Sequence, residues 1–134
     1  MLLLSLSGLA FAQGKVSRVP SLKDARQHHT ATLLSDGRVL VVGGRGTDGL
    51  STLSSCELYT PKKNAWTPCA PLTVARSHHA AVLLPDGRVL VTGGTTHESV
   101  DGQNRFVALA SAELYDPAKN KWTAAAPMAD ARNG

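Results

Sequence analysis

The stretch ARQHHTATLLSDGRVLVVGG at residues 25–44 recurs fifty residues later as ARSHHAAVLLPDGRVLVTGG at residues 75–94. Beyond the double glycine the offset becomes 56, because Glu-Leu-Tyr stands at 57–59 in the first copy and at 113–115 in the second. The second unit therefore carries six extra residues between these two landmarks. A period near fifty residues indicates a repeat architecture, in which each unit is one supersecondary module.

The pattern inside each unit predicts four short strands. Asp36-Gly37 supplies the positive φ angles of a tight hairpin turn, and Asn64 tolerates the left-handed region in a second turn. The apolar run before the double glycine is typical of a strand buried on both faces. In the first unit we expect strands at about 30–34, 38–42, 56–59 and 66–70.

An apolar strand that ends in Gly-Gly, followed by a spaced Tyr and a spaced Trp, resembles the kelch repeat. Both units carry every element, and the resemblance covers about residues 16–134, with the repeat positions Gly43, Gly44, Tyr59, Trp66, Gly93, Gly94, Tyr115 and Trp122. The resemblance implies an all-β fold, a β-propeller segment of two four-stranded antiparallel blades. Since propellers close with about four to eight blades, we expect an incomplete propeller that needs further blades.

The segment before the first unit also fits the repeat. At the same offset, Val16 aligns with Trp66 and Leu22 with Leu72, which predicts an extra, lone fourth strand at the N-terminus. Two explanations stay open for the blade number: an N-terminal piece of a longer propeller, or self-association through exposed blade edges. The expected parts are a lead-in at 13–24, repeats at 25–74 and 75–130, and the start of a third repeat at 131–134.

Residues 1–12, MLLLSLSGLAFA, form a short apolar run that ends in an A-x-A pattern. This arrangement is typical of a secretory signal peptide, although no Lys or Arg precedes the run. The run is too short to cross a bilayer as a helix, so we expect no transmembrane helix. The prediction is a secreted or extracytoplasmic protein, with a frayed apolar tail as the alternative.

Composition and charge limit the function classes that remain. The chain has 134 residues, 43% of them apolar and only 4% aromatic, so its core must be built from Val, Leu and Ala. The net charge of +4 comes without a basic stripe. Four lysines occupy matching predicted turns, which favours solvated turns over nucleic-acid binding; they are Lys62, Lys63, Lys119 and Lys121.

The two cysteines face each other in the expected register. If the turn is centred on 61–64, Tyr59 opposes Trp66 and Cys56 opposes Cys69, and both cysteines are replaced by alanine in the second unit. Directly opposed residues have Cα atoms about 4.5–5.5 Å apart, a spacing that a disulfide accepts. With an export signal this predicts a Cys56–Cys69 disulfide. The alternative is a pair of small buried apolar residues.

Paired histidines recur at 28–29 and 78–79 and invite a metal or catalytic interpretation. Neighbouring strand residues point to opposite faces, so His28 and His29 would not hold one ion together. A structural role, with one histidine packed between blades, is the favoured reading. His97 is a lone histidine, and the sequence predicts neither a metal nor another cofactor.

Topology assigns one face of the blades to recognition. The loops after the second and fourth strands emerge on the same side, and the six-residue insertion lies there. Loops on a rigid scaffold usually carry binding. For the arginines, the alternative to ligand binding is hydrogen bonding between blades, to carbonyls or carboxylates. For the insertion, the alternative is a change of loop length without a function. The candidate binding face is Arg26, Arg76, Arg45, Thr95, His97, Glu98, Asp101, Asn104 and Arg105.

Three function classes stay open. The first is a binding scaffold for a protein or glycan. The second is the propeller of a secreted copper oxidase that resembles galactose oxidase, or of another carbohydrate-active enzyme; Tyr59 and Tyr115 occupy ordinary repeat positions and are not assigned as copper ligands. The third is a structural surface protein. No catalytic constellation stands out, so a non-enzymatic role is favoured. Fold alone does not fix function.

Overall fold

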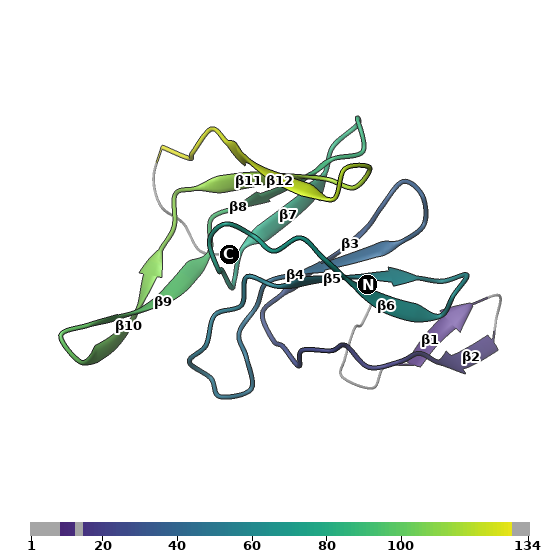
Figure 1. Cartoon of the computed structure of the whole chain (residues 1–134), viewed down its shortest axis with the longest axis horizontal. Helices are drawn as coiled ribbons and strands as arrows, with labels where there is room; N and C mark the ends of the chain where they lie inside the picture. The colour runs from purple at the N-terminus through teal and green to yellow at the C-terminus, as the bar shows by residue number, and fades with distance from the viewer. Residues whose placement is uncertain (1–8, 13–14, 130–134) are drawn as a thin grey trace.

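The computed structural model describes residues 9–12 and 15–129, and these residues form strands, turns and loops without a helix. Two four-stranded antiparallel sheets lie side by side (Figure 1). Blade 1 is built from β3 (Thr30–Leu33), β4 (Val39–Val42), β5 (Cys56–Thr60) and β6 (Ala65–Cys69). Blade 2 is built from β7 (Ala80–Leu83), β8 (Val89–Thr92), β11 (Ala112–Asp116) and β12 (Lys121–Ala125). The predicted propeller-type fold is confirmed, and no helix of the described residues is long and apolar enough to cross a membrane.

The predicted turns form at their expected positions, although the positive φ of the first turn is found at Gly37 and not at Asp36. Gly37 has a φ of 92°, and the carboxylate of Asp36 accepts a hydrogen bond of 3.0 Å from the backbone N–H of Arg38. Asn64 adopts a φ of 47° and accepts a hydrogen bond from the hydroxyl of Tyr59. The second unit repeats both features, which fixes the strand register in each blade.

The double glycine is required by a close approach between blades. Gly44 donates its backbone N–H to the carbonyl of Arg76 at 2.8 Å. A Cβ on Gly43 would stand 2.5 Å from the same carbonyl, and its φ of 62° also disfavours a side chain. Only a residue without a Cβ lets the start of blade 2 lie this close to blade 1.

The main core lies between the blades. Leu40 and Val42 of β4 pack with Val89 and Val91 of β8, all of them buried. The aromatic pair Tyr115–Trp122 of blade 2 packs in the same core. The aliphatic core expected from composition is therefore an interface between sheets, so the two blades share one hydrophobic layer.

The lead-in segment only partly follows its prediction. Lys15–Arg18 is a strand, β2, but it pairs with β1 (Leu9–Ala12) as a separate hairpin and is not the lone fourth strand expected. The match to the repeat holds from Pro20 onward. The Trp66 indole donates to the Pro20 carbonyl at 2.8 Å, as the Trp122 indole does to Ala70 at 2.7 Å. Residues 1–8, 13–14 and 130–134, with parts of the predicted leader, lead-in and third repeat, lie outside the described residues.

The outer sheet faces keep exposed apolar side chains. Leu33 of blade 1 is 64% exposed, whereas its repeat equivalent Leu83 packs against the core between the blades. Val82 on β7 is also exposed. Within the described residues, each blade thus has one face covered by its sister blade. The outer face of blade 1 is partly covered by Leu22, which packs with buried Val39 and Val41, and exposed apolar side chains remain on both outer faces.

Candidate binding face

The two repeat arginines are buried, in contrast to their predicted place on the binding face. The Arg76 side chain donates to the Gly93 carbonyl at 2.9 Å and to the Ser111 carbonyl at 2.9 Å, and it forms an ion pair of 3.1 Å with Glu113. Arg26 makes the corresponding bonds in blade 1, with an ion pair of 3.0 Å to Glu57. Both guanidinium groups are 0% exposed, so neither is free to bind a ligand.

The alternative interpretation, bonds to carbonyls and carboxylates, is confirmed for these arginines, with one correction. The partners of each arginine belong to the blade that it opens and not to the neighbouring blade. The link between blades comes from Glu113, which also accepts the backbone N–H groups of Thr73 and Val74 at 2.8 and 3.2 Å. We call each arginine with its carboxylate and carbonyl partners an arginine latch. The latch joins the segment that leaves blade 1 to the sheet of blade 2.

The paired histidines are part of the blade contact. His28 and His78 adopt φ angles of 57° and 56°, so they precede their strands and the alternation expected from a strand does not apply. Their rings stack at 3.9 Å between centroids. The ring of His79 is hydrogen-bonded to Thr30 across the blades at 2.8 Å. A structural role accounts for these contacts, and the described residues contain no cluster of three potential metal ligands.

Cys56 and Cys69 are direct partners in the ladder between β5 and β6, as the register predicts. Both side chains are buried and both thiols are free in this structure. The neighbouring Cys69 thiol lowers the pKa of Cys56, and Cys56 together with burial raises the pKa of Cys69. Cys56 also donates to the Ala70 carbonyl. The geometry fits a disulfide, and the bond itself stays a prediction.

The inserted segment is a β-hairpin and not the loop that the sequence suggested. β9 (Thr95–Val100) pairs with β10 (Gln103–Ala108) around an Asp101-Gly102 turn, whose φ angles are 52° and 74°. Positive φ at both turn residues defines the type I′ turn favoured in two-residue hairpins. The hairpin extends away from blade 2, on the same side as the loop that follows β4 (Figure 1).

One aromatic residue that the sequence analysis missed organises this face. The guanidinium carbon of Arg45 lies 4.2 Å from the ring centroid of Phe106, and the His97 ring meets the same ring edge-on at 5.7 Å. His97 is joined to the neighbouring loop, because its backbone N–H donates to the Thr52 hydroxyl at 3.0 Å. A lone phenylalanine in a polar insertion, in a chain with two, was the available signal.

The remaining candidates divide between scaffold and surface. Thr95 is buried and bonds to the backbone of Ser77, so it anchors the base of the hairpin. Glu98 and Arg105 form an ion pair of 3.3 Å with each other. Asp101 serves the turn, and Asn104 is exposed on β10. The surface available for binding is therefore smaller than predicted.

The loop after β4 completes the face. Asp48 holds the loop by accepting the backbone N–H groups of Leu50 and Ser51 at 3.0 and 2.8 Å, and it also binds the Ser51 hydroxyl. Leu50 at the loop tip stays exposed. An open depression of about 320 Å³ separates residues 46–53 from the segment 23–25. We call the hairpin 95–108 together with loop 45–53 the hairpin face.

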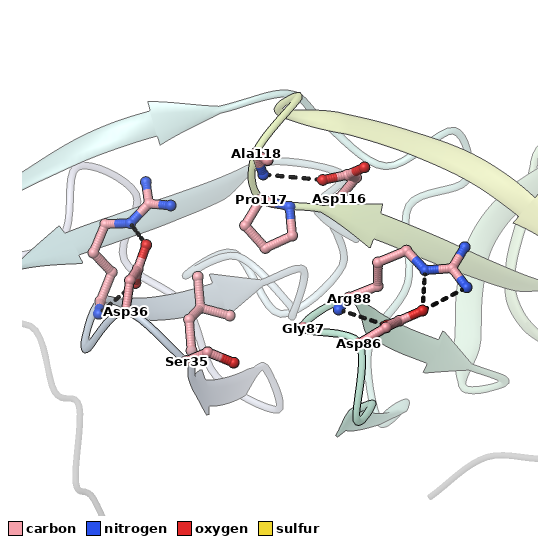
Figure 2. A pocket seen from close by; sticks show the side chains of 10 residues that line it. Ser35, Asp36, Asp86, Gly87, Arg88, Asp116, Pro117 and Ala118 are labelled. Atoms are coloured by element: carbon pink, nitrogen blue, oxygen red, sulfur yellow. Dashed lines mark hydrogen bonds and ion pairs between the residues drawn. The ribbon is translucent and has the colours of Figure 1, made fainter.

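A second hollow lies at the opposite end of the blades. Figure 2 shows this cleft of about 360 Å³, lined by the turns at 34–38, 84–88 and 116–118. Its two arginines form ion pairs inside their own turns, Arg38 with Asp36 at 2.8 Å and Arg88 with Asp86 at 2.9 Å, and the Asp116 carboxylate accepts the backbone N–H of Ala118 at 3.0 Å. The backbone N–H of Arg38 lowers the pKa of Asp36, which keeps this carboxyl ionised. Because local partners already engage these charges, the cleft is the weaker candidate.

The geometry defines a segment of a kelch-type β-propeller with an exposed hairpin face. The chain belongs to the family described as tRNA wybutosine-synthesizing protein 4, beta-propeller, whose model matches residues 23–133. It is 31% identical over 139 aligned residues to Kelch-like protein 25 of Rattus norvegicus, which covers 96% of this chain and 23% of that protein. It is also 31% identical over 111 residues to Beta-scruin of Limulus polyphemus, and that match covers 83% of this chain and 12% of Beta-scruin.

A solved structure supports the same fold. The structure of YjhT superimposes with a TM-score of 0.69 at 17% identity, covering 86% of this chain and 41% of that one. The chain thus spans less than a quarter of the length of the curated relatives that it matches. These similarities confirm the kelch-type propeller that the double glycine, tyrosine and tryptophan pattern indicated.

The buried histidine makes blade packing pH-dependent. Burial, and the nearby Arg76, lower the pKa of His79 from 6.5 to about 4. As the pH falls, His79 is protonated in the unfolded chain before it is protonated in the folded chain. The stabilising contribution of the neutral, buried ring is therefore full above about pH 6.5 and declines toward pH 4. One group shifted this far changes the free energy of unfolding by about 3 kcal/mol. We expect His79→Gln to flatten the pH dependence of urea unfolding between these values.

The control is the range above about pH 7, where the His79 ring is neutral in both the folded and the unfolded state, so His79→Gln and the parent protein should show the same slope there. An equal slope of unfolding free energy against pH between about pH 4 and 6.5 in His79→Gln and the parent protein would show that the buried ring does not control this stability.

Proposed function

We propose that this chain acts as a protein-binding segment of a kelch-type propeller and binds its ligand through the hairpin face. The observation that carries the proposal is the contact between exposed Phe106, on an insertion that the first repeat lacks, and half-buried Arg45 of the loop after β4. The arginine latches hold the base of this insertion on a rigid sheet. Rigid scaffolds that present variable loops are suited to recognition.

Exposed apolar groups support a protein ligand over a glycan. Phe106 is 40% exposed, and Leu50 and Val100 are also exposed large apolar side chains on the hairpin face. The other two such residues of the described chain are Leu33 and Val82, which lie on the outer blade faces. We propose that further blades, from the same protein or from associated copies, cover those outer faces and leave the hairpin face for the ligand.

A displayed random peptide library, selected on the immobilised full chain, tests this function. Hydrogen–deuterium exchange with the selected peptides should show protection at 45–53 and 95–108. Protection at the turns 34–38 and 84–88 instead would assign binding to the opposite cleft. Absence of any peptide binder, together with binding on a glycan array, would replace the protein ligand by a glycan.

We further propose that the protein is exported and that Cys56 and Cys69 are joined there. The apolar N-terminal run with its A-x-A pattern supports export, and the opposed positions of the two buried cysteines support the bond. Disulfides persist in oxidising compartments. In the reaction with oxidised glutathione, the two cysteine thiols lose two electrons and two protons, and glutathione disulfide becomes two glutathione thiols.

The full chain treated with oxidised glutathione should resist alkylation by iodoacetamide and keep the mass of one chain. Reduction should restore two alkylation sites, and Cys69→Ala should leave Cys56 without a partner. Two alkylated thiols after oxidation, or a bond that links two chains, would contradict the pairing.

A further inference from the structure

The outer edge of β10 has backbone groups without a partner among the described residues. The two-stranded sheet contains only β9 and β10, so the far side of β10 borders no other strand. In a two-residue hairpin, the two residues that flank the turn are hydrogen-bonded to each other. Hydrogen-bonded and non-hydrogen-bonded residue pairs then alternate along the two strands. Asn104 and Phe106 therefore direct their backbone N–H and C=O groups outward.

Contacts of the partner strand β9 confirm which residues direct their backbone groups outward. His97, which pairs with Phe106, donates its N–H outward to Thr52. Thr95, which pairs with Ala108, exchanges backbone hydrogen bonds with Ser77 at 2.8 and 2.9 Å. β9 thus uses its outward groups to attach the hairpin to the protein, whereas β10 offers the same groups to solvent.

The Phe106 ring, on one side of this hairpin, meets a positive charge that has no ion pair among the described residues, that of Arg45. The Arg45 side chain makes no ion pair and no hydrogen bond with the described residues, and its Nε is buried without a partner. Two acids of the hairpin face are engaged elsewhere, because Asp48 binds its own loop and Glu98 pairs with Arg105. Ladder partners share a sheet face, so His97 and Phe106 lie on one side and the Glu98–Arg105 pair on the other.

We propose that the outer edge of β10 accepts an extended acidic peptide segment of a partner protein as an added strand. The peptide backbone pairs with Asn104 and Phe106, and an acidic side chain on the Phe106 side of the sheet reaches Arg45. Strand addition supplies affinity through main-chain bonds, while alternate side chains supply specificity. This inference rests on the proposed protein-binding function and names the chemistry of its ligand.

The test uses three labelled, capped peptides that alternate valine with glutamate, glutamine or lysine, titrated into the full chain by fluorescence anisotropy. We expect the glutamate peptide to bind at least about tenfold more tightly than the other two, as one charge-assisted hydrogen bond would provide. Arg45→Gln should remove this preference. Arg105→Gln, which changes the arginine on the opposite side of the same strand, should retain it.

A second pair of variants tests the backbone. Asn104→Pro removes an outward N–H, which an edge strand tolerates, and should abolish peptide binding while circular dichroism and the melting temperature stay near those of the parent. Asn104→Ala keeps the N–H and should bind normally. Equal affinity for the three peptides, or no effect of Arg45→Gln and Asn104→Pro, would overturn the inference.

These experiments distinguish failure of the acidic-strand proposal from failure of the proposed protein-binding function. If library peptides protect the hairpin face but the glutamate peptide shows no preference, the protein-binding function stands and the acidic strand is wrong. If light scattering shows that Asn104→Pro dissociates a dimer of the parent chain, the edge pairs with a second copy, which also contradicts the proposal. If no peptide protects the hairpin face, the proposed function itself fails.

Discussion

The arginine latch is the interaction on which the rest of the structure depends. One buried guanidinium binds the end of the second strand, the start of the third strand and a glutamate that also holds the incoming segment. Arg26 and Arg76 repeat this arrangement with nearly the same distances. A buried ion pair contributes little when it is compared with a hydrophobic substitute, but loss of one partner leaves an uncompensated charge and is strongly destabilising. The latch therefore specifies where each blade begins.

Fixed blades explain both the double glycines and the location of variable sequence. Because the backbone carbonyl of Arg76 accepts the N–H of Gly44 and lies against Gly43, the contact between blades has no room for a side chain at Gly43. The same contact places the hairpin 95–108 and loop 45–53 next to each other, where His97 reaches Thr52 and Arg45 reaches Phe106. The residues that recur thus serve the scaffold, and the proposed recognition surface is made of residues that the repeat does not need.

The sequence predicted what local periodicity controls and failed where tertiary contacts decide. Strand positions, the Asp36-Gly37 turn and the opposition of Cys56 to Cys69 follow from alternation and turn chemistry, and all were predicted. The burial of Arg76 depends on Glu113, which lies far away in sequence, so the sequence offered bonds to carbonyls or carboxylates as an alternative to a place on the binding face but did not identify the partners. The hairpin was missed because its polar residues lack an apolar alternation, although Asp101-Gly102 signalled a type I′ turn. The role of Phe106 depends on Arg45 in another unit.

The most direct test of the central claim is the free energy of unfolding of Arg76→Met, compared with Arg88→Met in urea. Arg76 is fully buried beside Glu113, whereas Arg88 forms an exposed pair with Asp86. The latch predicts a loss of about 3–5 kcal/mol for Arg76→Met and of less than about 1 kcal/mol for Arg88→Met. Equal, small losses in the two variants would contradict the claim that the buried arginine sets the blade.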